Sequence, residues 1–352
     1  MTSPQGHLAG MAPLETRLRA QAFGLGFDLA GIATLGPADS RGQFDAWLRN
    51  GYAGSMTYLC GERAELRRDS SQPAPGMRSA LVVGLNYGGT QPGGPIARYA
   101  RGDDYHGVMR AKLQDLGEWL AAAARDAKAG VAQSRAYVDT GPVLERDLAR
   151  RAGPGWFGKN TNLINPRLGS FFFIGALFTN LELRPDAPFA ADRCGSCTRC
   201  LDACPTKAFV APCILDATRC ISYLTIELKG AIPTELRPAM GELLYGCDIC
   251  QDVCPWNIRF SRAVTEPALA PKQYHVTPDA VQLLRLDQVE WSARFASTAL
   301  SRAKRRGLAR NAAVALGNRR DPRTIPALVA ARRDDPEPLV REHADWALGQ
   351  FR

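Results

Sequence analysis

The feature that most constrains this sequence is a run of four cysteines in CGSCTRCLDACP, at positions 194–205. The spacing is Cys-x2-Cys-x2-Cys-x3-Cys-Pro, so three thiols share one tight loop and the fourth precedes a proline. An iron-sulfur cube takes three of its corners from such a loop, and the Pro-flanked thiol points to a second cube. This one motif therefore predicts two clusters.

A second block, GCDICQDVCPWN at 246–257, has the end of the same pattern, but Leu244 stands where its first thiol should be. Cys220, in TRCISYL, is the obvious substitute. Cys60 and Cys213 are left over, and we interpret them as small buried apolar residues. Eight ligands then form two sets: Cys194, Cys197, Cys200 and Cys254 in one, and Cys204, Cys220, Cys247 and Cys250 in the other.

Zinc is the competing interpretation, because zinc also binds Cys-x2-Cys pairs. A tetrahedral zinc site usually takes two pairs separated by a longer loop. Here three thiols fall within seven residues, and both blocks end in Cys-Pro. We therefore predict two 4Fe-4S clusters rather than zinc.

The ten cysteines also bear on the compartment. The N-terminus has no apolar run behind a basic start, and the most apolar stretch, at 171–178, is far shorter than a membrane span. We expect a cytoplasmic protein that does not enter a membrane. Thiols stay reduced in that compartment, which favours metal or redox chemistry over disulfides.

Patterning around the cysteines predicts an α/β layer before them and helices after them. An amphipathic helix is expected at 14–27 and strands at 80–87 and within 169–183. The segments 310–317 and 342–349 repeat at an offset of 32, as stacked helical repeats do. The sequence has neither a G-x-G-x-x-G dinucleotide fingerprint nor a P-loop. Motifs of this kind therefore do not identify the electron acceptor.

The last segment of the chain is basic. Positions 301–352 hold 12 Lys or Arg and 6 Asp or Glu, a net of +6 within a formal chain charge of +9. Clustered cations suit a phosphate backbone. A run such as RAKRR at 302–306 fits a solvated helical face equally well.

Several long segments resemble the bacterial epoxyqueuosine reductases almost end to end. They are RYARGDDYHGVMR (98–110), YVDTGPVLERDLARRAGPGWFGKNTNLINPRLGSFFFIG (137–175), the two cysteine blocks, RCISYLTIELKG (219–230) and the repeat tail. The resemblance implies an iron-sulfur and cobalamin enzyme that reduces epoxyqueuosine to queuosine at the anticodon wobble position of tRNA, the last step of queuosine synthesis. It also implies a GUN-anticodon tRNA substrate, a low-potential donor of the ferredoxin or flavodoxin type and a monomer.

The fold class that follows from the resemblance is α+β, with three parts. Residues 1–186 are expected to form a corrinoid domain like those of nitroreductases and reductive dehalogenases. Residues 187–265 are expected to form a ferredoxin-like insert with two 4Fe-4S clusters. Residues 280–352 are expected to form HEAT-like helical repeats that bind tRNA.

The resemblance gives Asp139, in V-D-T-G-P, the role of the acid that protonates the epoxide oxygen above the corrin. By itself, an Asp at a strand end before Thr-Gly-Pro is more often a turn or cap residue. The Asp-Thr-Gly triplet is also found in aspartic proteases, but they pair two such carboxylates, and this chain has no second copy.

The corrin contacts are also carried over from the family. The text at 104–109 lacks the glycine of D-x-H-x-x-G, so base-off cobalamin without an axial histidine is expected, and His106 becomes a pocket candidate. A polar loop suits the corrin amides, although turns have the same composition. The expected cobalamin contacts are Asp139, His106, Lys159, Asn160, Asn165, Ser170, Ser222, Lys229, Cys247 and Asp248.

Two other function classes stay open. A corrinoid reductase of a small molecule, such as a dehalogenase, would share the cofactors, and a secretion signal would favour it. A non-catalytic ferredoxin-type carrier would bind no corrin and would not need the long N-terminal part.

Overall fold

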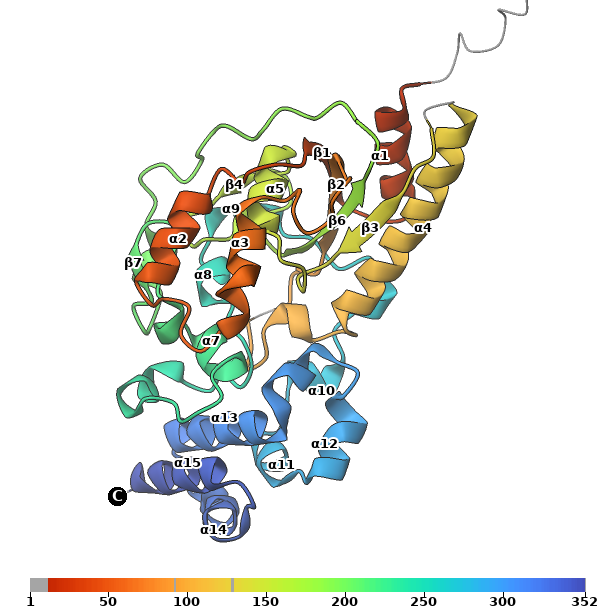
Figure 1. The fold of residues 1–352 in the computed structure, drawn as a ribbon. Helices are drawn as coiled ribbons and strands as arrows, with labels where there is room; N and C mark the ends of the chain where they lie inside the picture. The colour runs from red at the N-terminus through yellow and green to blue at the C-terminus, as the bar shows by residue number, and fades with distance from the viewer. Residues whose placement is uncertain (1–11, 92, 128–129, 352) are drawn as a thin grey trace, which may run out of the picture.

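The computed structural model describes residues 12–91, 93–127 and 130–351. Its N-terminal part is built on a four-stranded antiparallel sheet with the strand order β1-β2-β6-β3 (Figure 1). The central strands β2 and β6 pair along their whole lengths, which confirms the two strands predicted from the sequence. The four strands are β1 (Leu29–Thr34), β2 (Ser79–Asn86), β6 (Phe172–Thr179) and β3 (Ser134–Tyr137).

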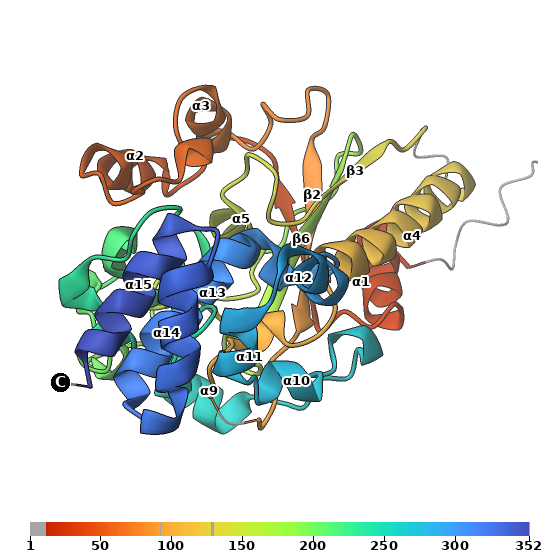
Figure 2. The same cartoon turned by 90° about the horizontal axis from the view of Figure 1, so that it is seen from below.

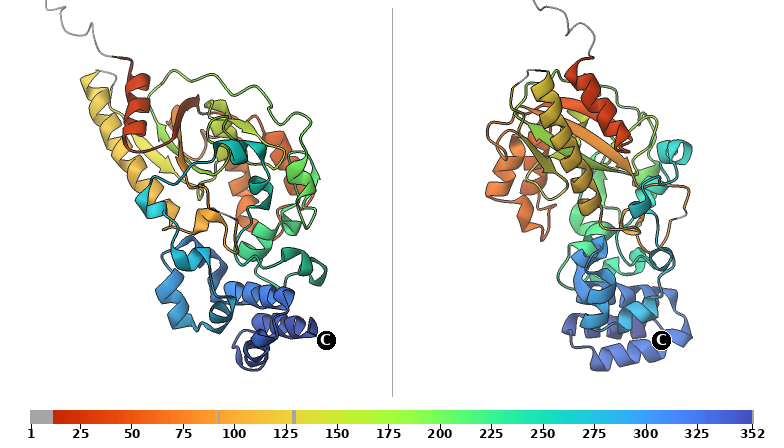
Figure 3. Two further views of the ribbon diagram at one scale, coloured as in Figure 1. Left: turned by 180° about the vertical axis from the view of Figure 1, so that it is seen from behind. Right: turned by 90° about the vertical axis from the view of Figure 1, so that its right-hand side faces the viewer.

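Helices cover both faces of this sheet because successive strand residues point in opposite directions. Leu81 and Val83 of β2 pack into one core with α1 (Leu14–Gly24) and α4 (Tyr105–Asp126), which lie side by side (Figure 3). Ala80 and Val82 pack on the other side with α5 (Glu145–Arg151). The helix predicted at 14–27 is confirmed as α1. The predicted mixture of helix and sheet is confirmed as well.

Helix α4 packs against β6. A Cβ atom at Gly175 of β6 would lie 2.7 Å from Met109 Cε, the flexible end of a side chain of α4. In the first turn of α4, Tyr105 stacks on Phe173 of β6 with the ring centroids 4.1 Å apart. This packing brings His106 and Asp139 into one place.

An extended segment at 182–194 crosses from the sheet to the cysteine region (Figure 1). Beyond it the chain folds into short elements, most of them beginning or ending beside a cysteine. Cys220 is the N-cap of α7, and Cys254 is the N-cap of α9, whose first residue is Pro255. The elements are α6 (Arg199–Asp202), β7 (Phe209–Ala211), β8 (Ile214–Leu215), α7 (Ile221–Ile226), α8 (Ile249–Asp252) and α9 (Pro255–Phe260).

Four smaller elements complete the N-terminal part. Helices α2 (Arg41–Arg49) and α3 (Glu62–Arg68) lie between β1 and β2 in sequence. The Trp47 indole N–H of α2 donates to the Leu215 carbonyl, which ties α2 to the cysteine region. A hairpin of β4 (Trp156–Phe157) and β5 (Leu163–Ile164) carries the polar loop predicted to contact the corrin.

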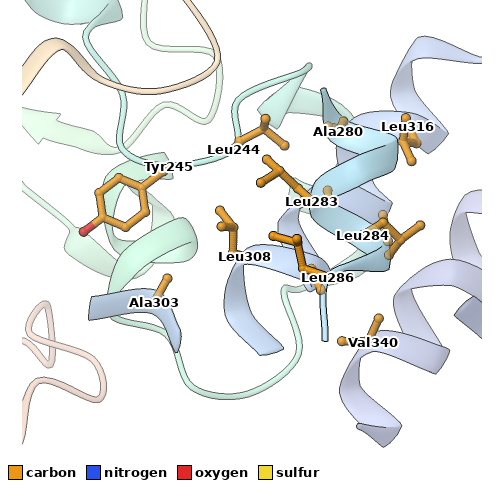
Figure 4. Close-up of a cluster of buried hydrophobic side chains, with 14 of the residues drawn as sticks. Leu244, Tyr245, Ala280, Leu283, Leu284, Leu286, Ala303, Leu308, Leu316 and Val340 are labelled. Carbon is orange, nitrogen blue, oxygen red and sulfur yellow. The ribbon is translucent and has the colours of Figure 1, made fainter. Parts of the chain in front are cut away.

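The C-terminal part is helical and forms its own core (Figures 2 and 4). The repeated segments 310–317 and 342–349 lie in two packed helices, α13 and α15. Gly317 makes this packing close, since a Cβ there would lie 2.8 Å from Ala347 Cα. The helices are α10 (Gln273–Val276), α11 (Ala280–Arg285), α12 (Gln288–Phe295), α13 (Lys304–Arg319), α14 (Ile325–Asp334) and α15 (Pro338–Gly349).

Two arginines of the basic tail are buried, so they do not belong to a solvated cationic face. Arg305 forms a buried ion pair with Asp335 at 2.7 Å. Arg310 is 1 % exposed and donates to the carbonyls of Leu228 and Gly230, at 2.8 and 2.7 Å. Arg305 therefore stabilises the tail, and Arg310 links the tail to the cysteine region. Neither guanidinium group is available to a phosphate backbone.

None of the helices in the described parts of the chain combines the length and the apolar character that a membrane crossing needs.

Candidate active site

The eight predicted ligand thiols lie around two separate cavities. The outer cysteine cavity, of about 560 Å³, is lined by one predicted set, Cys194, Cys197, Cys200 and Cys254. The inner cysteine cavity, of about 270 Å³, is lined by the other set, Cys204, Cys220, Cys247 and Cys250. The outer cavity takes three thiols from the first cysteine block and Cys254 from the second, whereas the inner cavity takes two from the second block, Cys204 from the first and Cys220 from between them. In the described residues no three His, Cys, Asp or Glu side chains are grouped to hold a single metal ion.

The substitution of Cys220 for the missing thiol has a structural reason. Leu244 is 1 % exposed and packs with Leu283 in the core of the C-terminal helices (Figure 4). Leu244 is therefore part of the core of the C-terminal helices. Cys220, the N-cap of α7, lines the inner cysteine cavity instead. The expectation that Cys60 and Cys213 are buried apolar residues is wrong, because both are exposed. Cys213 lies in the β7–β8 turn with a φ of 64°.

Burial makes these thiols poor acids. Burial, together with the nearby thiols of Cys254 and Cys194, raises the pKa of Cys200 to about 11. Burial is also the main reason why the pKa of Cys247 rises to about 12. Iron binds thiolates, so assembly of a cluster must displace these protons.

Asp139 lies on the loop after β3, in a third cavity of about 180 Å³ that we call the acid cavity. Its φ of 56° is in the left-handed region, which residues other than glycine rarely adopt. Glu145 stabilises this turn, because its carboxylate accepts the Asp139 backbone N–H at 2.7 Å. The Asp139 carboxylate accepts the Tyr105 hydroxyl at 3.0 Å and lies 3.5 Å from His106 Nε2.

The contacts in the acid cavity shift the protonation of its side chains. Desolvation opposes ionisation of Asp139, but the contacts with His106 and Tyr105 outweigh it and lower its pKa. Burial and the Asp139 charge raise the pKa of Glu145 to about 8. At neutral pH the cavity therefore holds one ionised carboxylate beside one neutral carboxyl group.

The acid cavity adjoins the inner cysteine cavity. Tyr87, Tyr99, Arg146 and Asn162 line both of them. The aromatic rings of Tyr87 and Phe173 lie 4.5 Å apart at the back of the acid cavity. A molecule bound in the acid cavity would therefore reach the wall of the inner cysteine cavity.

Six of the ten predicted cobalamin-contact residues line these adjoining cavities, among them Asp139 at the acid cavity and Cys247 at the inner cysteine cavity. Ser170 lines the acid cavity, and its hydroxyl donates to Gln251 at 2.9 Å. Asn160, Ser222 and Asp248 line the inner cysteine cavity beside Cys247. The Asp248 carboxylate is buried in an ion pair with Arg98 at 3.1 Å.

Three other predicted cobalamin-contact residues lie elsewhere. Lys159 lines the outer cysteine cavity, where its ammonium group donates to the carbonyls of Gly195 and Cys197 at 2.6 and 3.0 Å. The amide of the buried Asn165 donates to the Pro154 carbonyl at 2.5 Å, within the β4–β5 hairpin region. Lys229 is largely exposed, and partial desolvation together with nearby cations such as Arg302 lowers its pKa.

Sequence reasoning missed several side chains that shape the site. Glu145 and Arg146 follow Asp139 in the distinctive 137–175 segment, and Tyr105 directly precedes His106. Arg98 begins the segment 98–110 and reaches Asp248 of the second cysteine block. All four lie in the segments 98–110 and 137–175, which carry the family resemblance. Only the fold shows which side chain each of them contacts.

Comparison with known proteins agrees with this geometry. The family model for a 4Fe-4S double cluster binding domain matches residues 193–257, so iron-sulfur binding is confirmed for this region. The family model for epoxyqueuosine reductase QueG matches residues 67–140, which include Asp139. The chain is 42% identical to the epoxyqueuosine reductase of Pseudomonas aeruginosa over 98% of both chains. It is 37% identical to that of Escherichia coli over 96% of this chain and 89% of the relative.

Solved structures are similar over nearly the same length. A crystal structure of an epoxyqueuosine reductase with an epoxyqueuosine-modified tRNA-Tyr stem loop has a TM-score of 0.87 and 33% identity, over 96% of this chain and 90% of that chain. The Bacillus subtilis epoxyqueuosine reductase has a TM-score of 0.86 and 32% identity, over the same shares of the two chains. Together these matches show that the chain belongs to the epoxyqueuosine reductase family of oxidoreductases.

Proposed function

We propose that this chain reduces epoxyqueuosine to queuosine at the anticodon wobble position of tRNA, using two 4Fe-4S clusters and cobalamin. The observation that carries the proposal is the wall shared by the acid cavity and the inner cysteine cavity. Because the two cavities share this wall, a redox cofactor bound beside the cluster of the inner cysteine cavity would also contact the acid cavity. There the Asp139 carboxylate would face the substrate. Deoxygenation of an epoxide needs both electrons and a proton donor.

The residues of the adjoining cavities fit a corrinoid. Tyr87, Tyr99 and Phe173 offer flat apolar contact, while Asn162 and Ser170 supply donors and acceptors for peripheral amides. When bound, cobalamin would supply a low-potential two-electron centre. Asn160, Ser222 and Asp248 would contact it next to the inner cysteine cavity. In this proposal residues 1–186 hold the corrinoid, 187–265 the clusters and 280–352, as HEAT-like repeats, the tRNA.

Asp139 is the residue that we propose to protonate the departing oxygen. Its loop has a strained left-handed residue, held by hydrogen bonds from both sides, and such strain clusters at functional sites. The Bacillus subtilis relative has been observed with an aspartate catalytic loop swung out of its active site. Glu145 would keep the corresponding loop of this chain turned toward the acid cavity.

Electrons would enter at the outer cysteine cavity and leave at the inner one. Three exposed arginines, Arg193, Arg199 and Arg259, line the outer cysteine cavity, and none of them forms an ion pair with another described residue. Their charge suits an acidic low-potential carrier of the ferredoxin or flavodoxin type. We expect the chain to work as a monomer.

The proposed tRNA surface must exclude the buried Arg305 and Arg310. Lys304 and Arg306 at the start of α13 are exposed, and Lys229 lies close enough to both for its pKa to respond to their charge. Together they form a cationic patch next to Arg302 and Tyr58. A stem loop resting on this patch would bring its wobble base toward the acid cavity.

One assay tests the proposed function. Cluster-loaded protein with cobalamin and a strong reductant should convert epoxyqueuosine in tRNA to queuosine, as measured by mass spectrometry of nucleosides. Omitting cobalamin should abolish conversion. No conversion by protein with full iron content and a bound-cobalamin spectrum would refute the proposal. The tRNA-bound relative favours this reaction over the reduction of a halogenated small molecule.

A further inference from the structure

His106 lies between two carboxylates. Asp104 is the N-cap of α4, and its Oδ1 accepts the His106 backbone N–H at 3.0 Å and lies 2.7 Å from ring atom Nδ1. The other ring nitrogen, Nε2, is 3.5 Å from Asp139 Oδ2. Tyr105 stacks on the imidazole with the ring centroids 4.1 Å apart. Nδ1 is therefore hydrogen-bonded to Asp104, whereas the buried Nε2 has no hydrogen-bond partner among the described residues and lies at ion-pair distance from Asp139. The ring does not line the acid cavity itself.

These surroundings decide the charge of the imidazole. Partial burial and the positive end of α4 both oppose a charged ring. The two carboxylates within ion-pair distance favour the charged ring, and their effect outweighs that of burial and of the helix end. Burial opposes the charge, but the hydrogen bond to Asp104 and the contact with Asp139 raise the pKa of His106 to about 9. His106 is consequently an imidazolium at neutral pH.

The charged ring creates a question about Asp139. A carboxylic acid that protonates a substrate must hold a proton, yet the pKa of Asp139 is lowered by His106 and Tyr105 against desolvation. In the resting protein the proton is therefore on the imidazole and not on the carboxylate. The two groups interact strongly enough to titrate as a pair, so the relevant quantity is the proton that they share.

We propose that His106 is a positioning residue that stores this proton and returns it to Asp139 when the epoxide oxygen is to be protonated. The proposal rests on the proposed function. Reduction of an epoxide to an alkene consumes two electrons and two protons and releases one water. The electrons come from the clusters and the cofactor proposed above. The proton moves from Nε2 to Oδ2 and then to the oxygen as a C–O bond breaks. Solvent reloads His106 and supplies the second proton by the same route.

The other titratable groups beside Asp139 are not placed or charged to supply a proton to its carboxylate, so this role falls to His106. Glu145 contacts Asp139 through the backbone N–H rather than through the carboxylate that faces the ring. Tyr105 donates to Asp139, but the pKa of its hydroxyl is raised far above neutral by burial and by the Asp139 charge. The titratable and charged groups that face the pair are Asp104, Tyr105, Arg110, Glu145, Arg146, Tyr58, Arg67, Tyr99 and Tyr245.

The first test is a histidine NMR titration of the full-length, cluster-loaded protein without substrate. The chain has four histidines, so the ring signals can be assigned by substitution. His106 should titrate near pH 9, and Asp139→Asn should lower its pKa by one unit or more. Asp104→Asn should do the same while keeping the α4 cap, because Asn caps as well as Asp. The buried His343, whose pKa burial lowers to about 4, is the internal control. Titration of His106 near 6.5 in the parent would overturn the proposal.

The second test is the pH profile of single-turnover reduction of epoxyqueuosine in tRNA. The parent rate should stay level up to about pH 9. In His106→Gln the rate should fall progressively from pH 5 to pH 8, widening the gap to 10-fold or more. A loss that is the same at every pH would mean that His106 only supports the fold. Full activity of Asp139→Asn would likewise overturn the proton route. No conversion at any pH by the parent with full iron content and a bound-cobalamin spectrum would instead refute the proposed function, so the two failures are distinguishable.

Discussion

The two ends of the proposed electron route are built from different side chains. Around the outer cysteine cavity, Arg193, Arg199 and Arg259 are exposed cations that lack ion-pair partners among the described residues. The acid cavity, at the inner end, holds carboxyl groups whose protonation is set by contact with their neighbours. Free surface charge steers a charged partner, whereas shifted pKa values serve proton transfer. The outer end is suited to exchange of electrons with another protein, and the inner end to proton chemistry.

The largest expected effect comes from removing the cluster of the inner cysteine cavity, which would connect the two ends of the proposed electron route. Cys220→Ser should remove the cluster of the inner cysteine cavity, so iron and sulfide should fall by about half and turnover should be lost. The measurement is iron and sulfide analysis of anaerobic protein with EPR of the reduced state. Cys213→Ser is the matched control and should keep its iron. If the Cys213 variant lost iron and the Cys220 variant did not, the ligand assignment would be reversed.

The outer end can be tested without affecting the inner end. Arg199→Glu/Arg259→Glu should slow reduction of the clusters by an acidic flavodoxin about 10-fold, because the reversed charges repel the carrier. Reduction by dithionite, a small molecule, should be nearly unchanged. The readout is bleaching of the cluster absorbance in a stopped-flow experiment.

A charge-matched control for this variant is Arg332→Glu/Arg333→Glu, on exposed positions of α14. It should leave both reduction rates unchanged. Equal slowing by the two double variants would indicate an effect of net charge rather than a docking surface.

The inner end predicts a smaller effect on stability. The pKa of Glu145 is raised to about 8 from an ordinary value of 4.5. The native state therefore holds this proton more tightly, and the stability it contributes is complete below pH 4.5 and lost as pH rises through about 8. Glu145→Gln keeps an acceptor for the Asp139 N–H but cannot ionise. It should raise the unfolding midpoint by about 2–4 °C at pH 8 relative to the parent, with no gain near pH 4.5.

Circular dichroism of matched cluster-loaded samples measures this difference. A gain of the same size at both pH values would show that Gln packs better for reasons unrelated to charge.

Iron-sulfur binding by residues 193–257 was predictable because cluster ligation depends on local spacing, and the match to the 4Fe-4S double cluster family confirms it. Three thiols on one loop and a Cys-Pro ending predicted two 4Fe-4S clusters. The apolar pattern predicted the two central strands. The choice of Cys220 over Leu244 also came from counting, and the core around Leu244 supplies its physical reason.

Exposure and charge pairing were harder to predict because they depend on tertiary packing. Arg305 and Arg310 belong to the basic segment 301–352, yet Arg305 pairs with Asp335 at the end of α14, and Arg310 donates to backbone carbonyls of the cysteine region. Lys159 and Ser170 come from one polar stretch but lie at different cavities. Nothing in the spacing of His106 and Asp139 indicates that α4 and the loop after β3 meet.

The central claim is that Asp139 delivers a proton to the epoxide oxygen, and the rate of Asp139→Asn tests it most directly. Asn keeps the size of the side chain and tolerates the left-handed turn, but it has no proton to transfer. With cobalamin and tRNA binding verified, single-turnover formation of queuosine should fall by about 10²-fold or more. A rate close to that of the parent in protein with an intact cobalamin spectrum would contradict the claim.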